Sequence, residues 1–176
     1  NAFATNGYDV TVCDIKLEWA QNGINKIGAK LDKLVSREKM TADKAGEIKG
    51  NLKAGEYSDL ADCDLVVEAV LEIMETKKEL FSTLDGICKD SCIFGTNTSS
   101  LSVTEIAKGI KHPVIGMHFF NPADRMKLVE VISGINTPAE TKEAIIEISK
   151  SLGKTPVEVC RKVPGFVVKP YSDSLM

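Results

Sequence analysis

The sequence predicts an α/β fold built on a mainly parallel, doubly wound sheet, and two observations lead to this prediction. Short β-rich apolar runs, such as DLVVEAV at residues 64–70, are typical of strands that a parallel sheet buries on both faces. Between such runs, apolar residues recur at intervals of three and four, which is the spacing of helices packed against a sheet. Strands and helices that alternate along a chain indicate a parallel sheet covered by helices.

Each expected element has its own signal in the sequence. The strands are β-rich runs bounded by turn residues, and in chain order they are expected at residues 8–15, 64–70, 92–95, 113–120, 128–133 and 155–160. The helices show the helical spacing of apolar side chains, and they are expected at residues 16–40, 42–52, 75–87, 102–109 and 138–152. The segment SVTE at residues 102–105 fits a capping box, so we expect its helix to begin at Ser102.

Length, charge and cysteine content exclude several classes of protein. The 176 residues correspond to about one domain, and a net charge of −3, from 22 basic and 25 acidic residues, argues against nucleic acid as the main partner. The apolar runs are far shorter than the ~20 residues of a membrane span, so no membrane partner and no signal peptide are expected. Five cysteines without a framework pattern indicate reduced thiols, a cytoplasmic location and no metal site.

Polar side chains follow several of the predicted strands. Ligands of open α/β sheets bind beyond the carboxyl ends of the strands, so these side chains are candidates for one shared site. The candidates are Asp14, Glu72, Asn97, Ser99, Ser100, His118 and Asn121.

Asp14 ends the first predicted strand, and two interpretations of it are open. Its carboxylate could hold both ribose hydroxyls of an adenosine and repel a 2′-phosphate, or it could cap the helix that follows. The glycine-rich loop expected before such a strand is not seen. The chain opens with NAFATNGYDV, which looks like the end of the helix that this loop would start. Asp14 by itself therefore does not establish a nucleotide site.

The turn NTSSL, residues 97–101, places two serines before a predicted helix. Serines at such positions ordinarily cap helices through their hydroxyl oxygens. The alternative is that one hydroxyl points into a cleft and donates a hydrogen bond to a substrate oxygen.

His118 and Glu130 lie on two predicted strands joined by the turn-like segment NPADRM. Both could be ordinary core residues, because most buried histidines are satisfied by local hydrogen bonds. A carboxylate within LVEVI, however, would be costly to bury alone, and a nearby imidazole would stabilise it. An unperturbed histidine titrates near ~6.5, so such a pair would provide a base close to neutral pH. That base could take a proton from an alcohol as hydride leaves.

Four segments of the sequence resemble a known family, namely DCDLVVEAVLEIMETKKELF, NTSSLSVTEIA, GMHFFNPADRMKLVEVISG and PGFVV. The family is that of the 3-hydroxyacyl-CoA dehydrogenases, particularly the short bacterial 3-hydroxybutyryl-CoA dehydrogenases, and the resemblance extends over residues 2–168. It implies a Rossmann-like dinucleotide-binding domain. It also implies NAD-linked interconversion of 3-hydroxyacyl-CoA and 3-oxoacyl-CoA, in fatty acid oxidation or butyrate formation.

The resemblance also implies a role for each candidate residue. On the catalytic side, His118 would be the general acid/base and Glu130 the carboxylate that orients it. Ser99 would hydrogen-bond the 3-oxygen of the substrate, and Asn121 would lie beside the nicotinamide.

Further residues would contact the cofactor and the CoA moiety if the resemblance holds. Those on the cofactor side would be Glu72 and Lys77, which flank the ribose, together with Asn97 and Asp14. The helix that contains Lys30 and Arg37 would face the phosphates of the acyl-CoA substrate.

The sequence departs from the family pattern in several places. Lys169 stands where the family usually has an asparagine, and Asp124 and Arg125 stand where it is typically apolar or has proline. The family's first strand, glycine-rich loop and C-terminal helical domain are not seen. We therefore expect an incomplete dinucleotide-binding domain at residues 1–168, a divergent tail at 169–176, and no homodimer interface of the family's usual kind. The alternative to an enzyme is a catalytically impaired module that binds a nucleotide or CoA, or has a structural role.

Overall fold

The structure is a computed structural model that describes residues 1–159, and the chain divides into two compact units. The first unit is Asn1–Ala61, and the second begins at Asp62. Each unit has its own parallel strands and its own helices, so each is described by itself. Within residues 1–159, no helix is long and apolar enough to cross a membrane.

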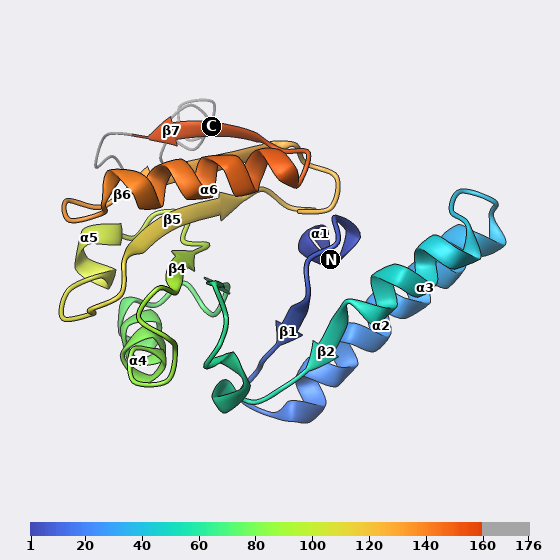
Figure 1. Ribbon diagram of the computed structural model, residues 1–176, viewed down its shortest axis with the longest axis horizontal. Helices are drawn as coiled ribbons and strands as arrows, with labels where there is room; N and C mark the ends of the chain where they lie inside the picture. Colours follow the sequence, from blue (N-terminus) through green and yellow to red (C-terminus); the bar gives the residue numbers. More distant parts are fainter. Residues whose placement is uncertain (160–176) are drawn as a thin grey trace, which may run out of the picture. The chain divides into compact units, whose positions relative to one another are not determined.

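The first unit pairs two short strands and packs two helices against them (Figure 1). Its elements are α1 (Ala2–Thr5), β1 (Val10–Val12), α2 (Leu17–Ser36), α3 (Ala42–Gly50), β2 (Leu52–Ala54) and the 3-10 helix η1 (Tyr57–Leu60). β1 and β2 are parallel, with Val10 opposite Leu52, so the chain must cross over between them, and α2 and α3 form that crossover. The buried core of the unit consists of Ala4, Leu31, Ala45, Ile48 and Leu52.

Three features of this unit differ from the sequence prediction. The strand expected at residues 8–15 is limited to β1, and the expected helix at 42–52 ends at Gly50 with the capping residue Asn51. The chain then forms β2, a strand that the sequence did not predict. β2 has only three residues and follows α3 directly, so its apolar residues extend the helical pattern. The residues before the first predicted strand were expected to be helical, and α1 occupies Ala2–Thr5.

The second unit contains a five-stranded sheet in the order β3–β4–β5–β6–β7 (Figure 1). The strands are β3 (Leu65–Glu68), β4 (Ile93–Thr96), β5 (Val114–Phe119), β6 (Leu128–Ser133) and β7 (Thr155–Val159). The helices are α4 (Met74–Leu84), α5 (Val103–Ile106) and α6 (Ala139–Ser151), and α6 packs on β5, β6 and β7. All neighbouring strands are parallel except β5 and β6, which are antiparallel. The prediction of an α/β fold with a mainly parallel sheet is confirmed.

Buried apolar side chains of the strands and helices form the core of the second unit. The largest of them that are fully inaccessible to solvent are Phe81, Leu84, Phe94, Ile106, Ile115, Met117, Val129, Val131 and Ile145. β5 is buried at five of its six positions, which fits a central strand covered on both faces. This core holds the strands in place. Because β3, β4 and β5 are parallel, their carboxyl ends lie at the same edge of the sheet. The antiparallel β6 begins at that same edge.

Candidate active site

His118 and Glu130 face each other across the antiparallel pair β5–β6. The register places them directly opposite, so their side chains project from the same face of the sheet. His118 Nδ1 lies 2.8 Å from Glu130 Oε2, and the side chains are 11% and 0% exposed, respectively. The ring of Phe120 packs against the imidazole with ring centroids 4.6 Å apart. A buried carboxylate is therefore paired with an imidazole that retains some access to solvent.

This geometry determines which nitrogen of His118 is basic. An ionised carboxylate only accepts hydrogen bonds, so the contact with Glu130 requires a proton on Nδ1. In the neutral ring, Nε2 is then the nitrogen that can accept a proton. A histidine oriented in this way by a buried carboxylate is the arrangement used for general acid/base chemistry.

Ser99 lies in a turn that follows β4, and Glu72 holds this turn. Glu72 Oε1 accepts hydrogen bonds from Thr98 Oγ1 at 2.7 Å, from the Ser99 amide at 2.7 Å and from the Ser100 amide at 3.1 Å. The hydroxyls of both serines also lie 3.3 Å from this oxygen. Partial burial alone would raise the pKa of Glu72. The hydrogen bonds from Thr98 and Ser99 and the charge of Lys77 outweigh burial and lower the pKa to about 2.

The interpretation of the two serines as helix caps is wrong. Ser102 is the N-cap of α5, as the SVTE pattern predicted, and its hydroxyl oxygen lies 3.4 Å from the Glu105 amide. α5 is shorter than predicted, because it ends at Ile106 and is followed by turns up to Gly109, whose φ of +86° interrupts a helix. Ser99 and Ser100 thus do not cap α5, and their amides and hydroxyls face Glu72 Oε1 instead.

Lys77 occupies an unexpected environment for a residue predicted to lie beside a ribose. Its ammonium lies 2.7 Å from Glu68 Oε1 and 3.3 Å from Glu72 Oε2, and its side chain is only 1% exposed. Glu68 is the partner that the sequence argument missed. The available signal was the same one that singled out Glu130, namely a carboxylate within an apolar run.

The two candidate asparagines occupy different positions relative to β5. Asn97 Oδ1 accepts a hydrogen bond of 2.8 Å from the Phe119 amide, so it holds the end of β5 beside the end of β4. Asn121 is exposed in the segment between β5 and β6. Lys154 secures that segment, because its ammonium donates to the carbonyl oxygens of Ala123 at 2.6 Å and Met126 at 2.8 Å.

The remaining candidates belong to the first unit. Asp14 follows β1, is exposed, and accepts a hydrogen bond of 2.7 Å from the Ile15 amide. The alternative that Asp14 caps the following helix is wrong, because the N-cap of α2 is Lys16. Lys30 is exposed on α2, and Arg37 is the exposed C-cap of that helix. The structure thus brings together His118 with Glu130 and Ser99 with Glu72, whereas Asp14, Lys30 and Arg37 lie in a separate unit.

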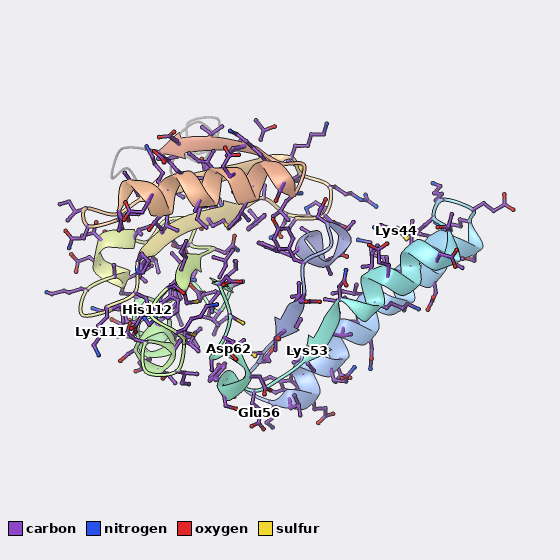
Figure 2. All side chains as sticks on the ribbon, in the orientation of Figure 1. Lys44, Lys53, Glu56, Asp62, Lys111 and His112 are labelled. Carbon is purple, nitrogen blue, oxygen red and sulfur yellow. The ribbon has the colours of Figure 1, made fainter. Side chains whose placement is uncertain are left out.

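A second histidine–carboxylate pair lies at the other end of β5. His112 precedes this strand, and its Nδ1 lies 2.6 Å from Asp85 Oδ1, while its Nε2 lies 3.0 Å from the Lys89 carbonyl oxygen. The imidazole stacks on Phe94 with ring centroids 4.5 Å apart. Figure 2 shows His112 and Lys111 beside α4, and the Lys111 amide also donates to Asp85.

The cysteines and the departures from the family pattern add little to the site. Burial raises the pKa of the Cys92 thiol to about 12, which suits a core residue. Among residues 1–159, no group of three or more His, Cys, Asp or Glu side chains is arranged to hold a metal ion. Asp124 and Arg125 are exposed between β5 and β6, and Lys169 lies outside the described residues.

Comparison with known proteins identifies the family. Residues 1–163 match the model of the 3-hydroxyacyl-CoA dehydrogenase, NAD binding domain. The chain is 48% identical over 173 residues to a 3-hydroxybutyryl-CoA dehydrogenase of Clostridioides difficile, an alignment that covers 94% of this chain and 60% of the relative. It is 43% identical to a 3-hydroxyadipyl-CoA dehydrogenase of Escherichia coli, over 96% of this chain and 37% of the relative.

Solved structures show the same relationship. The crystal structure of (S)-3-hydroxybutyryl-CoA dehydrogenase from Ralstonia eutropha matches with a TM-score of 0.92 at 36% identity, covering 99% of this chain and 62% of that one. A 3-hydroxybutyryl-CoA dehydrogenase from Escherichia coli K12 matches with a TM-score of 0.90 at 44% identity, covering 95% of this chain and 36% of that one. The chain thus spans about 60% or less of the length of these relatives. Sequence and fold agree that the chain belongs to the NAD-binding domain family of the 3-hydroxyacyl-CoA dehydrogenases.

Proposed function

We propose that the protein catalyses the NAD-linked interconversion of 3-hydroxyacyl-CoA and 3-oxoacyl-CoA, with His118 as the general acid/base. The observation that carries the proposal is the 2.8 Å contact between His118 Nδ1 and the fully buried Glu130 carboxylate. The membership of an NAD-binding family and the names of the relatives, which include 3-hydroxybutyryl-CoA dehydrogenases, support the choice of cofactor and substrate.

His118 and Glu130 together perform the proton transfer in this proposal. His118 Nε2 takes the proton of the substrate 3-hydroxyl group when the alcohol is oxidised and returns it when the ketone is reduced. Glu130 holds the imidazole in the tautomer with the proton on Nδ1 and stabilises the imidazolium that forms. NAD, when bound, supplies the hydride acceptor or donor. Ser99 donates a hydrogen bond to the 3-oxygen, from a turn whose backbone Glu72 fixes.

The residues of the first unit fit a role in binding NAD and CoA. Asp14 follows a parallel strand and is exposed, as is needed for a carboxylate that accepts hydrogen bonds from two ribose hydroxyls. Lys30 and Arg37 are exposed cationic side chains that could pair with phosphates of CoA. On this basis we propose NAD in preference to NADP, and we propose that residues 1–168 belong to a dinucleotide-binding domain.

The test is a reductase assay on the full chain with acetoacetyl-CoA and NADH, followed by absorbance near 340 nm. We expect turnover by the wild-type protein and a fall in kcat of about 10²–10⁴ in His118→Gln, because glutamine cannot carry the proton between substrate and solvent. His112→Gln is the matched control, because it removes the other histidine of the chain from a site that contacts no candidate catalytic residue. A kcat of His118→Gln equal to that of the wild type, or binding of NADH and acetoacetyl-CoA without any turnover by the wild type, would refute the proposed function.

A further inference from the structure

Glu68 is a buried carboxylate at the end of β3 to which the proposed chemistry assigns no role. It is only 2% exposed. Its Oε1 accepts hydrogen bonds of 2.7 Å from both the Lys77 ammonium and the Val70 amide, and its Oε2 accepts one of 2.7 Å from Thr96 Oγ1. These partners lie on α4, on the segment after β3, and on β4. Glu68 therefore joins three parts of the second unit at the edge of the sheet where the candidate site lies.

Lys77 connects Glu68 to the surface. Its ammonium lies between the carboxylates of Glu68 and Glu72, and of these two carboxylates only Glu72 reaches solvent, with 36% of its side chain exposed. A buried ammonium requires a compensating charge, because removing it from water costs several kcal/mol. Glu68 provides that charge, so Lys77 can remain in the interior and present one N–H toward Glu72.

Glu72 transmits this arrangement to the turn that carries Ser99. One of its oxygens faces Lys77, and the other accepts the hydrogen bonds of the Ser99 and Ser100 amides. An unbroken series of contacts, each 3.3 Å or shorter, thus runs from Glu68 through Lys77 and Glu72 to Ser99.

We propose that Glu68 is a positioning residue for Ser99. Its buried charge fixes Lys77, Lys77 fixes the carboxylate of Glu72, and Glu72 fixes the backbone that aims the Ser99 hydroxyl at the substrate. The proposal rests on the proposed function only in its last step, which assumes that Ser99 contacts the substrate. In this proposal Lys77 holds the Glu72 carboxylate even when no cofactor is bound, whether or not its ammonium also contacts a ribose.

The decisive variant is Glu68→Gln combined with Lys77→Met. Removing only one charge of a buried pair leaves the other uncompensated and can unfold the domain, whereas replacing both charges is often tolerated. The double variant therefore keeps the fold while it separates Glu72 from its buried support. The single variant Glu68→Gln, which keeps the shape of the side chain, shows how much of the effect depends on its charge.

The measurement is residue-resolved amide hydrogen exchange on the full chain without cofactor. We expect the Ser99 and Ser100 amides to exchange about tenfold faster or more in the double variant, because hydrogen bonds to a charged acceptor protect them. Amides within β5 and β6 should keep wild-type rates. Unchanged exchange at Ser99 and Ser100, or an equal increase throughout β5 and β6, would overturn the proposal.

The matched control is Asp85→Asn, which removes a charge from the buried Asp85–His112 pair and lies outside the candidate site. This variant should leave exchange at Ser99 and Ser100 unchanged, whatever its effect on global stability. In the acetoacetyl-CoA assay, kcat should fall about tenfold or more in the double variant and stay at the wild-type value in Asp85→Asn. If the wild-type chain shows no turnover, the proposed function fails, but the exchange experiment still decides whether Glu68 positions the turn.

Discussion

The two histidines of the chain lie near opposite ends of β5, and each contacts a carboxylate through Nδ1. At His112, both ring nitrogens face acceptor oxygens, those of Asp85 and of the Lys89 backbone. The His112 side chain is 3% exposed, and its carboxylate partner, Asp85, is 11% exposed. At the other pair the imidazole is the more exposed partner: the His118 side chain is 11% exposed, whereas Glu130 is fully buried.

This difference shows that a histidine–carboxylate contact alone does not define a catalytic pair. Asp85 also accepts hydrogen bonds from the backbone amides of Lys111 and His112, so this pair ties the segment before β5 to the end of α4. Glu130, by contrast, lies within β6, at the edge of the sheet where β3 and β4 end in the polar residues Glu68 and Thr96. We therefore interpret the His112–Asp85 pair as structural, and we propose a catalytic role only for the His118–Glu130 pair.

The largest expected effect is the loss of turnover when the proposed catalytic pair, His118–Glu130, is altered. Glu130→Gln preserves the shape of the side chain but removes the charge that orients His118 and stabilises its imidazolium. We expect kcat for acetoacetyl-CoA reduction to fall by about 10²–10⁴, the usual contribution of a positioned acid/base group. Steady-state kinetics with NADH measure the fall, and circular dichroism confirms that the variant is folded. An unchanged kcat would mean that the pair, like His112–Asp85, is only structural.

The corresponding change at the structural pair should affect stability and leave turnover unchanged. Burial alone would raise the pKa of Asp85, but the hydrogen bonds from the His112 ring and from the His112 and Lys111 amides lower it. Asp85→Asn should therefore reduce the free energy of unfolding by about 2–3 kcal/mol, because it weakens hydrogen bonds to a charged group. Urea unfolding measures this loss. The comparison would fail if Asp85→Asn lowered kcat as strongly as Glu130→Gln does.

The acid dependence of stability distinguishes Glu72 from an ordinary surface carboxylate. Its pKa is about 2 in the folded chain, below its ordinary value of 4.5, so the folded state favours the ionised form. The resulting stabilisation is fully present above about pH 4.5 and is lost as the pH falls toward 2. The stability difference between wild type and Glu72→Gln should therefore shrink over that interval. Thermal unfolding at a series of pH values tests this, and a constant difference would contradict it.

The smallest expected effect concerns the segment between β5 and β6. Lys154→Met removes the ammonium that binds the carbonyl oxygens of Ala123 and Met126, which should loosen the segment that contains Asn121. We expect kcat/KM to fall by up to about tenfold through misplacement of this segment. Lys142→Met is the matched control, because Lys142 pairs with Glu158 near the surface. Equal effects of the two substitutions would show that the segment does not depend on Lys154.

Most of the second unit could be predicted because its signals are local. β3 to β7 are short apolar runs, and the helices between them have clear apolar periodicity. Glu130 could be singled out because a carboxylate within an apolar strand needs a partner, and the connection between β5 and β6 is short enough to place His118 beside it. The same argument applies to Glu68, but there the apolar run was interpreted only as a buried strand.

The features that could not be predicted depend on contacts between residues far apart in the sequence. β2 pairs with β1 about 40 residues earlier, and its three residues are too few to show a strand pattern of their own. His112 contacts Asp85 across 27 residues, and Lys154 reaches Ala123 across 31. Neither contact has a sequence signal, because Asp and Lys residues near turns are common and most of them are exposed to solvent.

A double-mutant cycle across His118 and Glu130 tests most directly whether the two residues act as one unit. The cycle compares kcat for acetoacetyl-CoA reduction in wild type, His118→Gln, Glu130→Gln and the variant with both substitutions. Because Glu130 is proposed to act only through His118, Glu130→Gln should change kcat by less than about threefold when His118 is already glutamine. If the two losses instead multiplied in the double variant, His118 and Glu130 would act independently, and the proposed catalytic pair would be wrong.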